Sequence, residues 1–132
     1  MKIFFEKGLL GLESYKNYDL QDIKGNNEYK VLNCLDNKEI SLVVMSPFNI
    51  KNDYEINLSE EVIKNLKIES KDDVTLYTTV ILNSDYRKMT TNLRAPIVIN
   101  EQSLLGEQII LPKESYEIKH PIYKEEADVS NY

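Results

Sequence analysis

The sequence predicts an all-β fold, a small antiparallel barrel-like domain (a pseudobarrel) with one short helix. Three observations lead to this prediction. Apolar runs of strand length recur along the 132 residues and are separated by turn-forming residues. Only one stretch has both the spacing and the cap of a helix. The chain length suits one domain, and 42% apolar and 29% charged residues are typical of a globular protein.

The first third of the chain predicts a strand, a compact turn and a hairpin. Residues 2–5 form the first expected strand, and Gly8 and Gly11 bracket a turn directly after it. A second turn at 24–27 precedes an apolar run at 29–35, which a short connection joins to the run at 39–45. We expect these two runs to pair as a hairpin. Residues 40–45 are almost continuously apolar, which indicates a strand covered on both faces.

The middle of the chain predicts a strand followed by the helix. Pro47 ends the preceding strand, and residues 53–58 alternate between polar and apolar positions as a half-buried strand does. Ser59 then offers a hydroxyl cap, and Glu60 and Glu61 suit the positive end of a helix dipole. The helix spans barely two turns, since its apolar face ends at Leu66.

The last third predicts four more strands. The longest is 74–82, with apolar or threonine side chains on both faces. Strands at 89–93 and 96–100 are interrupted near Pro96, and a final strand at 108–111 ends before Pro112. We expect one domain over residues 1–123, followed by a polar, acidic C-terminal tail at 124–132.

Charge and composition exclude several classes of protein. The net charge is −6, and no basic footprint is present, so direct binding to nucleic acid is not expected. The apolar runs are too short to cross a membrane, and the first residues do not resemble a signal peptide. A single cysteine, Cys34, fits a reducing compartment. We therefore expect a cytoplasmic monomer.

Reactive constellations are missing from the sequence. A metal site of histidine and cysteine needs several ligands, whereas this chain has only His120 and Cys34. It has four glycines and no glycine-rich phosphate loop, and no Gly-x-Ser-x-Gly motif. We expect no enzymatic activity, no metal and no cofactor. Nine tyrosines instead favour a binding role, and four near turns or strand ends are expected to be exposed: Tyr15, Tyr18, Tyr54 and Tyr86.

Several fragments together resemble one protein family. Residues 5–13 read FEKGLLGLE, close to an opening of the form Phe-x-x-Gly-Leu-Pro-Gly-Phe-Glu, and VMSP at 44–47 is followed by Asp53-Tyr54. The most specific fragment is TNLRAPIVIN at 91–100, followed by GEQIIL at 106–111 and YEIKHPI at 116–122. In this order they resemble the family of the flagellar assembly factor FliW over residues 3–123. Leu10 and Leu12 depart from its usual proline and phenylalanine.

The resemblance implies a non-enzymatic, barrel-like protein with two protein partners. These are flagellin and the RNA-binding translational regulator CsrA, bound in alternation, so that free FliW antagonises CsrA repression of flagellin translation. We expect the partner-binding residues to be Asn92, Arg94, Asn100, Asp53, Tyr54 and Glu13. We expect the residues that shape the loops to be Gly8, Gly11, Pro96 and Gly106.

Alternative interpretations remain open at this point. Asn92 and Asn100 fit equally well as residues that satisfy turn backbone, and residues 97–99 as buried sheet. The protein as a whole could be a secretion chaperone for flagellin only. It could also be a small ligand-binding β-barrel, which would show a deep pocket with convergent polar groups.

Overall fold

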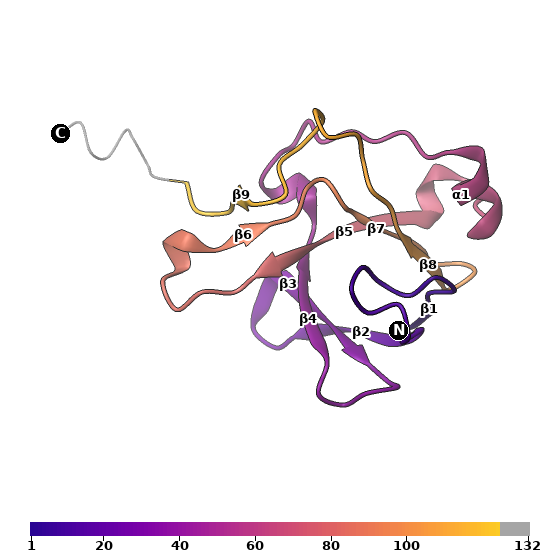
Figure 1. Cartoon of the computed structure of the whole chain (residues 1–132), viewed down its shortest axis with the longest axis horizontal. Coiled ribbons are helices and arrows are strands. Elements are labelled where there is room, and N and C mark those ends of the chain that lie inside the picture. Colours follow the sequence, from indigo (N-terminus) through magenta and orange to yellow (C-terminus); the bar gives the residue numbers. More distant parts are fainter. Residues whose placement is uncertain (125–132) are drawn as a thin grey trace.

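The computed structural model describes residues 1–124, and these form a ring of strands that is not a regular barrel (Figure 1). The ring runs in the order β4-β3-β2-β1-β8-β7-β5 and closes where β4 pairs with β5. The elements are β1 (Lys2–Phe4), β2 (Asn17–Ile23), β3 (Asn26–Cys34), β4 (Ser41–Met45), β5 (Val74–Ile81), β6 (Thr90–Thr91), β7 (Ile97–Asn100), β8 (Leu105–Gln108) and β9 (His120–Pro121), with 3-10 turns η1 (Pro47–Asn49), η2 (Lys71–Asp73) and η3 (Tyr86–Lys88).

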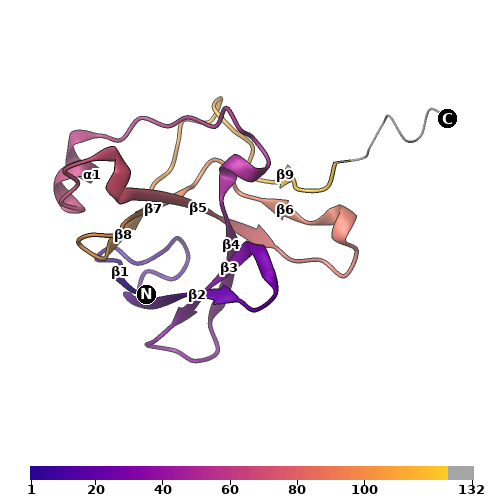
Figure 2. The same ribbon diagram turned by 180° about the vertical axis from the view of Figure 1, so that it is seen from behind.

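The ring is antiparallel except where β1 and β8 meet in parallel, with Phe4 opposite Leu105. It is also incomplete between β4 and β5, which pair at only two positions, Val44 with Thr79 and Met45 with Thr78. Beyond this closure, β6 and β9 extend the sheet along the second half of β5 and project from the ring. Figure 2 shows this extension from behind, with α1 (Glu60–Asn65) at the opposite side of the ring. The all-β prediction with one short helix is confirmed.

Two faces of β5 and its neighbours bury two separate sets of side chains. The ring interior is filled by large residues from most of its strands, including Phe5, Tyr18 and Tyr77, and Phe5 and Tyr18 meet edge to face at 5.5 Å. The outer face of β5 and β7, with Leu76 and Val98, is covered by α1 and by the segments on either side of it. Because both faces are covered, β5 carries apolar or threonine side chains on both.

The helix forms where its local signals predict it. The Ser59 hydroxyl accepts a hydrogen bond from the Val62 N–H at 3.2 Å, and the two following glutamates lie in the first turn. Val62 and Leu66 are buried against Val98 of β7. The predicted hairpin is also confirmed, because β3 and β4 pair from Tyr29–Met45 to Asn33–Ser41.

The predicted strands differ from the observed ones at three places. Residues 53–58 form no strand within the described part of the chain, although Tyr54 and Ile56, at alternate positions, pack against the core. The strand expected at 108–111 is β8, which begins and ends three residues earlier. β2 was not predicted at all, because only Tyr18 and Leu20 of its seven residues are buried. The predicted tail lies outside the described residues from position 125 onward.

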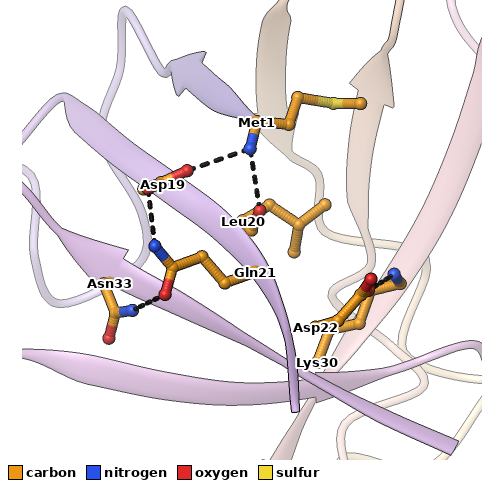
Figure 3. A network of polar contacts seen from close by, with 7 residues as sticks. All are labelled: Met1, Asp19, Leu20, Gln21, Asp22, Lys30 and Asn33. Carbon is orange, nitrogen blue, oxygen red and sulfur yellow. Dashed lines mark hydrogen bonds and ion pairs between the residues drawn. The ribbon is translucent and has the colours of Figure 1, made fainter. Parts of the chain in front are cut away.

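A polar network covers the outer surface of β2 and β3 (Figure 3). The Met1 amine donates to the Asp19 carboxylate and to the Leu20 carbonyl, each at 3.0 Å, and the Gln21 amide joins Asp19 to Asn33. The hydrogen bond from the amine, followed by that from Gln21, lowers the pKa of Asp19 below its usual value. The contacts of Met1 hold the start of β1 against β2.

Candidate functional site

Three segments, each from one of the sequence fragments that resemble the family, meet at an aromatic junction. The Tyr54 hydroxyl donates to the Leu93 carbonyl at 2.6 Å, and the Tyr54 ring lies 4.5 Å from that of Tyr116 between centroids. The Tyr116 hydroxyl in turn contacts both backbone groups of Glu55, at 3.0 and 3.1 Å. We call Tyr54, Leu93 and Tyr116 the tyrosine junction. It holds residues 53–55, 91–96 and 113–117 together.

The expectation that Tyr54 and Tyr18 are exposed was wrong. Tyr54 is 4% exposed and Tyr18 is fully buried, because each ring fills part of an apolar core. Burial, with a smaller contribution from Tyr116, raises the pKa of Tyr54 well above its usual value, so its hydroxyl stays protonated as the donor to Leu93. Tyr86 is exposed as predicted, whereas Tyr15 is half-buried.

Asn92 and Arg94 form the turn between β6 and β7. The Asn92 side-chain oxygen accepts from the N–H groups of Arg94 and Ala95, at 3.0 and 3.2 Å, so it satisfies turn backbone. The Arg94 guanidinium is half-buried, and its Nε donates to the Tyr116 carbonyl at 2.8 Å. Arg94 lines a shallow depression of about 270 Å³ together with basic and acidic side chains: Lys51, Lys113, Glu114 and Glu117.

Asp53 and Glu13 both lie at the surface, but in different places. Asp53 is next to the tyrosine junction, and its carboxylate lies 3.5 Å from the Lys51 ammonium. Glu13 accepts the Gly11 N–H at 2.7 Å and so closes the loop at 8–13. Gly8 and Gly11 adopt φ of +68° and +77°, and a side chain on Gly8 would meet the Glu13 backbone at 2.7 Å.

Gln108 connects this loop to the motif, and sequence reasoning did not single it out. Its side-chain oxygen accepts the Leu10 N–H and its nitrogen donates to the Ala95 carbonyl, both at 2.9 Å. Leu10 and Ala95 are far apart in the sequence. The one signal was the presence of Gln108 inside the fragment GEQIIL, which does not reveal what its amide contacts.

The remaining predicted residues serve the backbone. Asn100 is 1% exposed; its nitrogen donates to the carbonyls of Leu66 and Lys67, and its oxygen accepts the Gln102 N–H. It therefore joins the end of α1 to the β7–β8 turn. Pro96 is buried, and a Cβ on Gly106 would lie 2.3 Å from the Phe5 ring. Asn100 is thus not available at the surface to a partner.

The contacts of these residues hold surface loops in place. Among residues 1–124, no group of three or more histidine, cysteine or acidic side chains is arranged to hold a metal. The described part of the chain also contains no helix long and apolar enough to span a bilayer. Fold and site together define a small β-ring protein in which residues of the sequence fragments build and connect surface loops.

Comparison with known proteins narrows this class to one family. The family model described as FliW protein matches residues 1–122. The flagellar assembly factor FliW of Clostridium tetani strain Massachusetts / E88 is 51% identical over 124 residues, 94% of this chain and 86% of the relative. That of Clostridium botulinum strain 657 is 46% identical over 125 residues, covering 95% and 87%.

The fold agrees with the sequence comparison. A crystal structure of the flagellar assembly factor FliW matches with a TM-score of 0.88 at 30% identity, over 95% of this chain and 87% of that one. The chain belongs to the FliW family. The resemblance seen in the sequence fragments is thereby confirmed.

Proposed function

We propose that this protein is a flagellar assembly factor that works by binding other polypeptides rather than by catalysis. Its partners are flagellin and, in alternation, the RNA-binding regulator CsrA, so that the free protein antagonises CsrA repression of flagellin translation. The observation that carries the proposal is the match to the FliW family over residues 1–122. The two partners are those that the family resemblance implies.

The charge of the molecule supports a basic protein as one partner. The chain carries a net charge of −6. An acidic surface attracts a basic RNA-binding protein and repels RNA phosphates, which favours binding to the regulator over binding to its RNA. Asp53 and Glu13 are exposed acids next to the loops that the motif residues build.

Alternation needs negative coupling between the two partners. Occupancy by flagellin must lower the affinity for CsrA, either because the two surfaces overlap or because binding at one changes the other. The tyrosine junction and Gln108 link the 8–13, 53–55 and 91–96 segments into one connected unit. Such a unit offers a physical route by which contact at one loop reaches another.

The test is to measure binding of purified CsrA and of flagellin, separately and in competition, by calorimetry at two salt concentrations. Asp53→Lys should weaken CsrA binding and flatten its salt dependence. Glu13→Gln removes charge while keeping an acceptor for the Gly11 N–H, and Glu28→Lys on β3 reverses an exposed charge as a matched control.

Each outcome separates the candidates. Binding of both partners with mutual exclusion supports the proposal. Binding of flagellin without any CsrA complex at micromolar concentration would leave a secretion chaperone for flagellin only. Loss of affinity in Glu28→Lys equal to that in Asp53→Lys would show that net charge, and not the surface near the junction, controls the interaction.

A further inference from the structure

The first half of β5 has an open edge. Along this strand the backbone groups of alternate residues point to opposite sides. The Asp73 carbonyl accepts from Glu101 at 2.9 Å and the Thr79 carbonyl accepts from Asn92 at 3.1 Å, so odd-numbered residues face β7 and β6. Even-numbered residues therefore face the β4 side, where Thr78 is paired with Met45.

The β4 ladder stops before it reaches the next even-numbered residue. In continued register Leu76 would lie opposite Pro47, which has no N–H, and the chain turns there into η1. Within residues 1–124, the N–H and C=O of Leu76 and the C=O of Val74 take part in no hydrogen bond. Backbone groups that are half-buried and unpaired are ready to pair with another strand.

This edge lines an apolar groove of about 660 Å³. Its walls come from residues 54–58, from α1 and from β5, and its main apolar side chains are Phe48, Ile56, Leu58, Ile63, Ile68 and Leu76. Phe48 is 46% exposed and Ile63 is 38% exposed, so the groove opens to solvent. Free main-chain donors and acceptors beside apolar side chains are the combination that binds an added strand.

Charge indicates what kind of strand fits. Residues 51–76, which surround the groove, carry seven acidic and four basic side chains, a net charge of −3 and half of the total of −6. A second copy of this chain would bring like charges together, which disfavours it as the occupant. A basic segment is attracted. A small metabolite would contact the apolar walls but would leave the backbone groups of Val74 and Leu76 unpaired.

We propose that the groove beside Leu76 binds an extended polypeptide segment, apolar at alternate positions and basic at its flanks, that adds to β5 as a strand. The proposal rests on the proposed function, because it names the surface through which a protein partner is held. Backbone pairing supplies part of the affinity, and side chains of the segment fill the space between Phe48 and Ile63.

Amide hydrogen exchange followed by NMR tests the edge directly. In the free protein the Leu76 amide should exchange at least about tenfold faster than that of Tyr77, which faces β7. The probe is the capped peptide Lys-Val-Lys-Val-Thr-Val-Lys-Val-Lys, and a version with proline in place of threonine is its control. Binding of the first peptide should slow exchange at Leu76, and the proline version should bind at least about tenfold more weakly.

Matched variants locate the side-chain contacts. Ile63→Lys places a cation in the groove and should weaken peptide binding about tenfold or more. Ile81→Lys makes the same change at a comparably exposed position at the far end of β5 and should leave binding unchanged. CsrA and flagellin are then added in place of the peptide, with the same readout at Leu76.

The outcomes distinguish this proposal from the proposed function. If CsrA or flagellin binds while neither they nor the peptide alter exchange at Leu76, the groove proposal is overturned and the function stands. If neither protein binds but the peptide protects Leu76, the function fails and the groove proposal survives. Slow exchange of Leu76 in the free protein overturns the proposal, and so does protection that grows with protein concentration alone, since it would indicate a second copy.

Discussion

The same substitution at two buried tyrosines should change stability in opposite directions. Tyr54→Phe removes the donor at 2.6 Å from the Leu93 carbonyl and leaves that buried oxygen unpaired, which costs about 1–3 kcal/mol. The Tyr18 hydroxyl is buried and has no hydrogen-bond partner among residues 1–124. Tyr18→Phe removes an unpaired polar group and keeps the ring against Phe5, so we expect a gain of about 1 kcal/mol.

Urea unfolding followed by circular dichroism measures both effects. The two variants should differ by about 2–4 kcal/mol in the free energy of unfolding. With a urea dependence of about 2 kcal/mol per molar, their midpoints should separate by about 1–2 M, with wild type between them. Equal stability of Tyr54→Phe and wild type would refute the role given to the tyrosine junction. A clear loss in Tyr18→Phe would show that its hydroxyl is paired in solution.

Three further predictions concern the loops and the pH dependence. Gly8→Ala should lower the free energy of unfolding by about 2 kcal/mol or more, because it adds a backbone clash to the strain of a positive φ. Gly25→Ala has the same kind of strain but no clash, so it should lower the free energy of unfolding by only about 1 kcal/mol, and thermal unfolding compares the two variants. Asn100→Ala should lower the free energy of unfolding by about 1–3 kcal/mol, because it leaves the Lys67 carbonyl without a donor and the Leu66 carbonyl with only the Ser103 hydroxyl. Asn100→Asp should be no more stable, because it places a carboxylate against both carbonyls; an Asp variant of wild-type stability in urea would contradict this. Burial, followed by the neighbouring Cys34 thiol, raises the pKa of Tyr18 to about 12 from 10.0, so the unfolded chain ionises this group more easily than the folded protein does. Ionisation of Tyr18 therefore leaves the free energy of unfolding unchanged below pH 10 and lowers it as the pH rises toward 12; urea unfolding across this range should show a shallower decline in Tyr18→Phe.

Local signals in the sequence predicted the elements that depend on local contacts. The helix begins at its serine cap, and the β3–β4 hairpin joins two neighbouring apolar runs. Local signals were not sufficient for residues 53–58. Their alternation predicted a strand, and Tyr54 was expected at the surface, whereas Tyr54 is buried beside Ile56 and no strand forms. A strand also needs a partner, and pairing depends on segments far away in the sequence.

β2 shows the converse failure. Its seven residues, NYDLQDI, include two aspartates, an asparagine and a glutamine, which have low strand propensity. It is nevertheless a strand, because it pairs with β1 on one side and β3 on the other and buries Tyr18 and Leu20 in the ring. Pairing with neighbouring strands therefore overrides the local preference, and the composition of the segment alone does not predict this pairing.

Several of the predicted site residues contact the protein's own backbone in the structure. Asn92 and Asn100 satisfy backbone groups, and Tyr54 anchors a loop from beneath. Polar residues of the sequence fragments can be recognised whether they contact a partner or the protein's own backbone. Only the three-dimensional contacts distinguish these two roles. Buried amides and hydroxyls of this kind hold their loops in one conformation, which lowers the entropy lost on binding. The side chains that meet a partner are then to be sought among the exposed neighbours of the motif, such as Asp53, and along the unpaired edge at Leu76.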